Sequence, residues 1–323
     1  MRKIYFLLII LAICGSNYAQ DATPTEAGSM SADTTPKPKY WVFKTLTGFN
    51  AAQTTFTNWS AGGENSVSGN VVANLNATYT KDGHNWESLL QTEYGMMWTP
   101  SQKFNKTVDK LFVASKYGYR IEKTQKKNIW LYTVSLDFQT QYDNGYKTIG
   151  DADYISTWMA PGYLNASVGI DYHYKNIFSA YMAPLTGRTT FVLDTFLSNR
   201  ASYGLKNPGD KILAELGFSA KASVNATICK NVTLQSALSL FTPYSKEDFG
   251  NFVVDWNVLL LMKVNSFLSA TVNTNLKYDD KVRHVDADGS ITGPKVQFKE
   301  MITVGLVYAF DSTKPPTKRK HKG

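Results

Sequence analysis

Cysteine is nearly absent from this sequence, with Cys14 and Cys229 the only two among 323 residues. Cys14 falls within a segment that has the pattern of a signal peptide, so only Cys229 is expected in the mature chain and no internal disulfide can form there. The sequence also lacks any apolar run of about 20 residues, the length that a helix needs to cross a bilayer. A disulfide-stabilised fold and a helical membrane anchor are thereby excluded, and residence in a membrane must rely on strands.

Residues 1–19 are the expected signal peptide. Two basic residues precede an apolar run over residues 4–13, and small residues then lead to Ala19, where cleavage is predicted. Residues 20–39 are mainly Thr, Ser, Pro and Ala, which bury too little apolar surface to offset the entropy of ordering. They are predicted to be a disordered linker.

The positive charge of the chain is not spread over its body. The formal net charge is +8, but Arg2 and Lys3 leave with the signal peptide. Residues 311–323 form a basic tail, predicted to be periplasmic, and the remainder is close to neutral. We therefore expect no binding of nucleic acid. The basic residues near the C-terminus are Lys314, Lys318, Arg319, Lys320 and Lys322.

Histidine is scarce as well, with four in the chain, and only His173 falls on a predicted strand. It lies two residues from Asp171 and could act as a general base, but no serine is tied to it by a motif. A polar residue of a barrel lumen is the favoured interpretation. The sequence predicts neither an enzyme nor a cofactor.

What the sequence does contain is alternation of apolar and polar residues. From Ile212 to Ile228 every second residue is apolar, and those between are mostly polar or small. A strand with this period of two lies between an apolar and a polar medium. The apolar positions include several alanines, which suit contact with lipid better than a tightly packed core.

The same pattern recurs from residue 40 to residue 310 and predicts an all-β fold, a transmembrane antiparallel up-and-down β-barrel of about 12 strands, of the outer-membrane type. Short connections alternate with long ones, as expected for periplasmic turns and outer loops. A soluble all-β fold is the alternative, but it gives no reason for this sorting. The predicted strands are 41–56, 67–80, 85–97, 107–120, 128–142, 162–174, 176–186, 211–228, 231–242, 252–264, 266–278 and 296–310.

The most distinctive local motif is the string from Asn58 to Ser66, NWSAGGENS. Together with residues 53–56, Trp86 and Tyr94-Gly95, it resembles the outer-membrane barrel family catalogued as domain-of-unknown-function family 3078. The resemblance implies a barrel in the cell outer membrane over residues 40–310 and implies no activity. A structural constriction is the favoured role of the loop, with ligand contact as the alternative. Its candidate residues are Asn58, Trp59, Gly62, Gly63, Glu64 and Asn65.

A second loop, at Asp286 and Asp288 followed by Gly289, is similar to the front of a calcium-binding loop. Gln297 occupies the position of the bidentate Glu, which favours a simple turn. No metal site is predicted.

The phase of the strands sends acidic and basic side chains into the lumen in nearly equal numbers. Twelve strands enclose a narrow core, so the predicted function is a narrow channel or binding barrel for small solutes in contact with outer-membrane lipid. The alternative is a closed structural or interaction barrel whose basic tail contacts a periplasmic partner. The candidate lumen residues are Glu93, Lys116, Asp137, Asp171, His173, Glu215, Lys221, Asp255 and Lys263.

Overall fold

The structure is a computed structural model, and it describes residues 40–55, 65–101, 103–122, 128–146, 152–175, 177–265, 267–281, 283–285 and 291–312. Its main strands are β1 (Trp41–Thr54), β2 (Ser66–Lys81), β3 (His84–Thr99), β4 (Lys103–Arg120), β5 (Asn128–Thr140), β8 (Gly162–Tyr174), β9 (Phe178–Phe191), β10 (Ile212–Cys229), β11 (Val232–Pro243), β12 (Val253–Lys263), β13 (Leu268–Asp279) and β16 (Gln297–Asp311).

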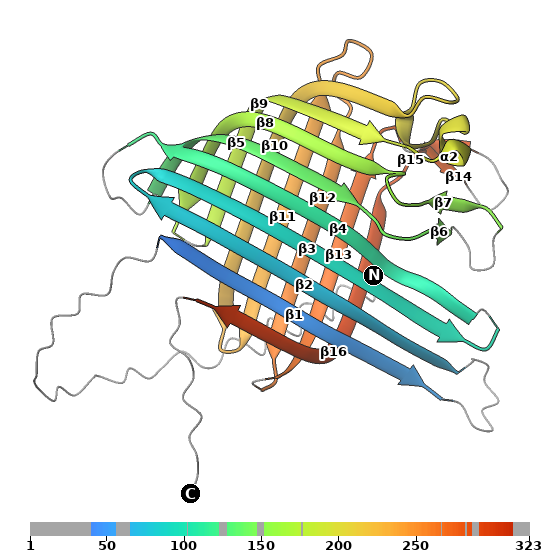
Figure 1. The fold of residues 1–323 in the computed structure, drawn as a ribbon, viewed down its shortest axis with the longest axis horizontal. Coiled ribbons are helices and arrows are strands. Elements are labelled where there is room, and N and C mark those ends of the chain that lie inside the picture. Colours follow the sequence, from blue (N-terminus) through green and yellow to red (C-terminus); the bar gives the residue numbers. More distant parts are fainter. Residues whose placement is uncertain are drawn as a thin grey trace, which may run out of the picture.

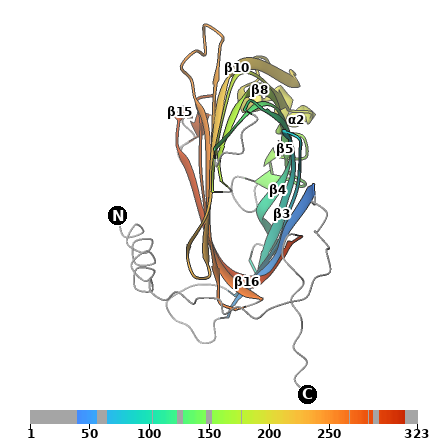
Figure 2. The same cartoon turned by 90° about the vertical axis from the view of Figure 1, so that its left-hand side faces the viewer.

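These twelve strands form one closed antiparallel barrel in which each strand pairs with the next along the chain, and β1 pairs with β16 to close it (Figure 1). The predicted fold class is confirmed. In Figure 2 the strands form two facing walls, with β3, β4 and β5 in one of them and β16 at a narrow edge. Lys44 of β1 is in register with Asp311 of β16, so the first and last strands begin and end at the same mouth.

The predicted strand boundaries agree with the structure to within a few residues except at β9. That strand was predicted over 176–186 and continues to Phe191 because Pro184 sits in a bulge. The outer loops also contain short elements that the alternation did not predict. They are β6 (Gly145–Tyr146), β7 (Tyr154–Ser156), α2 (Thr195–Asn199), η2 (Ser202–Gly204), β14 (Arg283–Val285) and β15 (Ile291–Pro294).

Two glycines near the bulge in β9 leave no room for a side chain, and the bulge itself explains the first of them. A Cβ at Gly169 of β8 would lie 2.1 Å from the carbonyl oxygen of Met182, so no side chain fits where β9 bulges toward β8. At Gly217 of β10 a Cβ would lie 2.1 Å from the carbonyl oxygen of Thr242 on β11. Pro184 is tolerated in β9 because the bulge removes its backbone nitrogen from the hydrogen-bonded ladder.

The two faces of the strands have the predicted polarity. On β5 the side chains of Tyr132 and Val134 are more than half exposed on the outside, whereas Thr133 and Ser135 between them are buried. The stretch from Ile212 to Ile228 behaves in the same way, with Leu216 exposed and Ser219 buried. The barrel therefore presents an apolar outer surface and a polar interior, as an outer-membrane barrel does.

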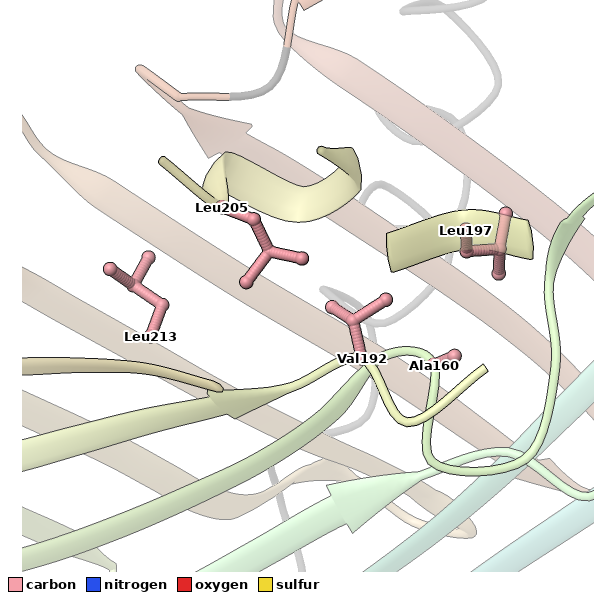
Figure 3. Close-up of a cluster of buried hydrophobic side chains, with 5 residues drawn as sticks. All are labelled: Ala160, Val192, Leu197, Leu205 and Leu213. Carbon is pink, nitrogen blue, oxygen red and sulfur yellow. The ribbon is translucent and has the colours of Figure 1, made fainter. Parts of the chain in front are cut away.

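The outer mouth is partly covered by the segment between β9 and β10. Asp194 caps the N-terminus of α2 by accepting a hydrogen bond from the backbone N–H of Leu197 (2.9 Å). Figure 3 shows the small apolar cluster beneath α2 and η2, to which Leu213 of β10 contributes an inward side chain. This explains why an apolar residue occupies a lumen-facing position there. The cluster consists of Ala160, Val192, Leu197, Leu205 and Leu213.

Two further observations concern the chain as a whole. Among the described residues no helix has the length and apolar character needed to cross a membrane. Cys14 lies outside the described residues, and the expectation of no internal disulfide concerns the chain after cleavage near Ala19, which keeps only Cys229.

Candidate functional site

An ion pair joins two strands that are not neighbours across part of the lumen. Lys221 on β10 donates to the carboxylate of Asp137 on β5, and Asn165 on β8 donates to the other oxygen of Asp137 (2.7 Å). β8 and β9 separate β5 from β10 in the barrel order, so the lysine spans the interior rather than the wall. Asp137 is 4% exposed, and the pair narrows the lumen at this level.

A second cluster lies nearer the mouth that holds the short turns. Lys116 on β4 places its Nζ 2.5 Å from Oδ2 of Asp171 on β8, and Nε2 of His173 lies 2.9 Å from the same oxygen. Glu87 on β3 is 3.6 Å from Lys116. Asp171 is completely buried, and its Oδ1 has no hydrogen-bond partner. The carboxylate is thus stabilised from one side only, by a lysine and a histidine.

The histidine of this cluster is bound to a carboxylate and, within the described chain, to no serine or cysteine. Ser179 on β9 lies opposite His173 in the register, but its hydroxyl is paired with that of Ser223 at 2.7 Å. His173 itself is bound to Asp171.

A third layer of contacts lies nearer the mouth that holds the long loops, and its basic residues were not among the predicted lumen residues. Arg188 on β9 lies 3.5 Å from Asp279 on β13, and its guanidinium stacks between the rings of Tyr163 and Phe241. Four strand-to-strand steps separate β9 from β13, so this contact also crosses the interior. The alternation of residues did not predict Arg188 as a lumen residue, because the bulge at Pro184 interrupts the pattern and the predicted strand ended at residue 186.

Just outside this layer, Lys281 joins two carboxylates of different segments. Its Nζ is 2.6 Å from Glu215 of β10 and 3.0 Å from Asp248 in the loop between β11 and β12. Burial lowers the pKa of Lys281, but the hydrogen bonds to both carboxylates outweigh it and raise the pKa above its ordinary value. For Asp248, burial raises the pKa, but the hydrogen bonds from Lys281 and Ser245 outweigh it and lower the pKa below its ordinary value. The lysine therefore stays charged and holds the loop against the barrel.

A cavity of about 10 Å³ lies between these two outer ion-pair groups, lined in part by Arg188, Glu215 and Lys281. It has room for about one water molecule.

The remaining predicted lumen residues lie elsewhere in the barrel. Glu93 on β3 accepts a hydrogen bond from Asn70 (2.8 Å), and Asp255 on β12 lies 3.5 Å from Lys277. Lys263 lies at the end of β12 near the short turns and is exposed. Of the loop motif only Asn65 is described; Asn58, Trp59, Gly62, Gly63 and Glu64 lie outside the described residues. So do Asp286 and Asp288, and the described part of the chain holds no group of three potential metal ligands.

Comparison with known proteins bears on the first half of this barrel. Residues 51–146 match the model of the family described as "Protein of unknown function (DUF3078)". The predicted family resemblance is confirmed over this segment. It covers the chain from β1 to β6, a shorter stretch than the predicted 40–310. No curated protein matches the sequence.

Several solved structures are similar to the chain at low identity. An outer membrane channel from Pseudomonas putida F1 is 10% identical, with a TM-score of 0.38, 88% of this chain and 100% of that chain being covered. The NanC porin is also 10% identical, with a TM-score of 0.35 and coverage of 81% and 98%. The translocator domain of the autotransporter NalP from Neisseria meningitidis is 7% identical, with a TM-score of 0.29 and coverage of 85% and 90%.

Proposed function

We propose that this protein is an outer-membrane barrel that admits small polar solutes to a narrow lumen, as a channel or a binding barrel. The observation that carries the proposal is the Asp137–Lys221 pair, which crosses a polar interior inside an apolar exterior. A lumen lined by charges of both signs favours water and hydrated solutes, and it differs from the packed interior of an apolar core. The pair narrows the lumen where it spans it, so we infer that it acts as a constriction for solutes that pass on that side.

The proposed orientation follows from the connections. Strands β2 and β3 are joined by a tight turn at Asp82-Gly83, on the side where β1 begins and β16 ends, and the long loops lie at the other end. In an outer-membrane barrel the short turns face the periplasm. The basic tail over 311–323 would then also lie in the periplasm, where it could contact a partner.

An epitope tag inserted between Pro208 and Gly209 should be reached by antibody on intact cells, because these exposed residues belong to a long outer loop. A tag of the same length between Asp82 and Gly83 is the matched control and should be labelled only after permeabilisation. Immunofluorescence of both strains makes the measurement. Labelling of the Asp82-Gly83 tag on intact cells would reverse the orientation.

Single-channel recording tests the constriction. The wild-type barrel in a planar bilayer should conduct weakly and with little ion selectivity, because the lumen charges nearly cancel. Lys221→Glu should raise the conductance and favour cations, since it replaces the bridge by two facing carboxylates. Lys263→Glu, an exposed lysine far from the bridge, is the control and should change the conductance little.

A closed scaffold is the second candidate function, and the layered contacts at Lys116, Lys221 and Arg188 favour it. In that case neither wild-type protein nor Lys221→Glu carries current despite verified insertion. That result would remove the channel and leave a structural or interaction barrel.

A further inference from the structure

The seam that closes the barrel is incomplete. β1 and β16 pair over seven residues, from Lys44 with Asp311 to Asn50 with Gly305, whereas β1 pairs with β2 over all fourteen of its residues. In the same register residues 51–54 would face residues 304–301, yet these two segments share no ladder hydrogen bonds. At about 3.4 Å per residue, the unpaired stretch is roughly 14 Å long.

The side chains beside this gap place it in the apolar band of the outer surface. Ile302 and Val304 of β16 are more than half exposed on the outer face, and Phe49 and Val67 flank the other side. Among the described residues nothing pairs with these two strand edges, so the hydrogen-bonded wall of the barrel is interrupted at this level of the apolar band.

Directly behind the gap, lysines enter the lumen from three strands. Lys299 of β16 reaches across the interior and donates to the backbone carbonyl of Thr107 on β4 (3.3 Å), although β1, β2 and β3 separate these strands along the wall. Lys110 of β4 donates to Gln91 (3.3 Å). Lys277 of β13 interacts electrostatically with both of these lysines.

The positive charge of Lys110 and Lys299 is only partly balanced. Within the described chain neither ammonium group lies within ion-pair distance of a carboxylate. The two acids nearby already have other partners, Asn70 for Glu93 and Lys277 with Asn275 for Asp255. Each ammonium has three donors and uses one, on a neutral oxygen at 3.3 Å. This cluster therefore has donors available for an anionic group.

We propose that the β1–β16 gap is a lateral portal for a single-chain amphiphile with an anionic head group. The head group binds Lys299 and Lys110 inside the lumen, and the hydrocarbon chain passes between residues 51–54 and 301–304 into the bilayer. A hollow of about 630 Å³ borders the paired part of the same seam and is lined largely by apolar residues, among them Phe49, Val71, Leu306 and Tyr308. This inference goes beyond axial passage of solutes and holds whether or not the axial path conducts.

The head-group contact is tested in nanodiscs of neutral phosphatidylcholine with spin-labelled stearate, using electron paramagnetic resonance to measure its association relative to spin-labelled phosphatidylcholine. The wild-type protein should select stearate. Lys110→Gln with Lys299→Gln should lower that preference about tenfold, as expected for two contacts of roughly 0.7 kcal/mol each. Lys206→Gln, which removes a lysine from an exposed loop away from the gap, should leave it unchanged. An equal preference in the double variant and the wild type would overturn the proposal.

The lateral route is tested by closing the gap. Ala52→Cys with Thr303→Cys occupies facing positions of the extended register, and its disulfide should abolish stearate selection until dithiothreitol is added. Ala52→Cys alone, treated identically, controls for effects of dithiothreitol on single cysteines, including Cys229. Undiminished stearate binding with the disulfide formed would refute the portal. Disulfide-linked dimers of the single variant would also refute it, and would assign the edge to a second copy of the chain.

Discussion

Replacement of Lys116 by methionine should destabilise the barrel by about 3 to 5 kcal/mol, the cost of leaving a buried carboxylate without its cation. Asp171 is completely buried, and Lys116 Nζ lies 2.5 Å from its Oδ2. The other carboxylate oxygen has no hydrogen-bond partner to compensate for the loss. The free energy of unfolding in detergent, measured by denaturant titration, reports the effect.

Two controls separate the lost charge from the lost packing. Lys206→Met removes a lysine from an exposed loop and should change the unfolding free energy by less than about 0.5 kcal/mol. The double variant Lys116→Met with Asp171→Asn removes both charges and should recover much of the loss, because no ion then remains buried. If the double variant is as unstable as Lys116→Met alone, packing and not charge explains the effect.

Arginine at Leu75 should destabilise the barrel by roughly 2 to 4 kcal/mol, whereas arginine at the adjacent Asn74 should be tolerated. Both residues lie in the middle of β2, at the same depth. Leu75 is exposed on the apolar outer face, and Asn74 faces the lumen between Leu46 and Gln91 of the neighbouring strands. The charged group at position 75 must leave lipid or distort it, while at position 74 it meets polar side chains and water.

Folding into lipid bilayers, measured as an unfolding free energy for both variants, distinguishes the two faces. Equal destabilisation by Leu75→Arg and Asn74→Arg would show that β2 does not separate lipid from a polar lumen. Because the two sites are adjacent and receive the same residue, differences in strand propensity or depth do not account for a large difference between the unfolding free energies of the two variants.

The layered ion pairs connect the fold to both proposals. Axial passage meets Lys116, then Lys221, then Arg188, each bound to a carboxylate of another strand. The lateral gap opens instead toward Lys110 and Lys299, which have no ion-pair partner within the described chain. The two routes therefore use different lysines, and the Lys221 and Lys299 variants test them separately.

The sequence by itself determined the class of fold and the faces of its strands. Alternation is a local property with a period of two, so Tyr132 and Asp137 could be assigned to opposite faces without knowledge of any partner strand. The order of the strands also followed, because short and long connections alternate along the chain. Asp137, Asp171 and Lys221 were predicted to face the lumen for this reason.

Only the tertiary structure decided which of these groups meet. The pairs Lys221–Asp137 and Arg188–Asp279 join strands that are three and four steps apart, and such contacts depend on the curvature and stagger of the closed barrel. The bulge at Pro184 had the same origin, since it is defined by the register of β9 against β8 and β10. The short pairing of β1 with β16 depends on how the two ends of the sheet meet, which no local pattern in either strand records.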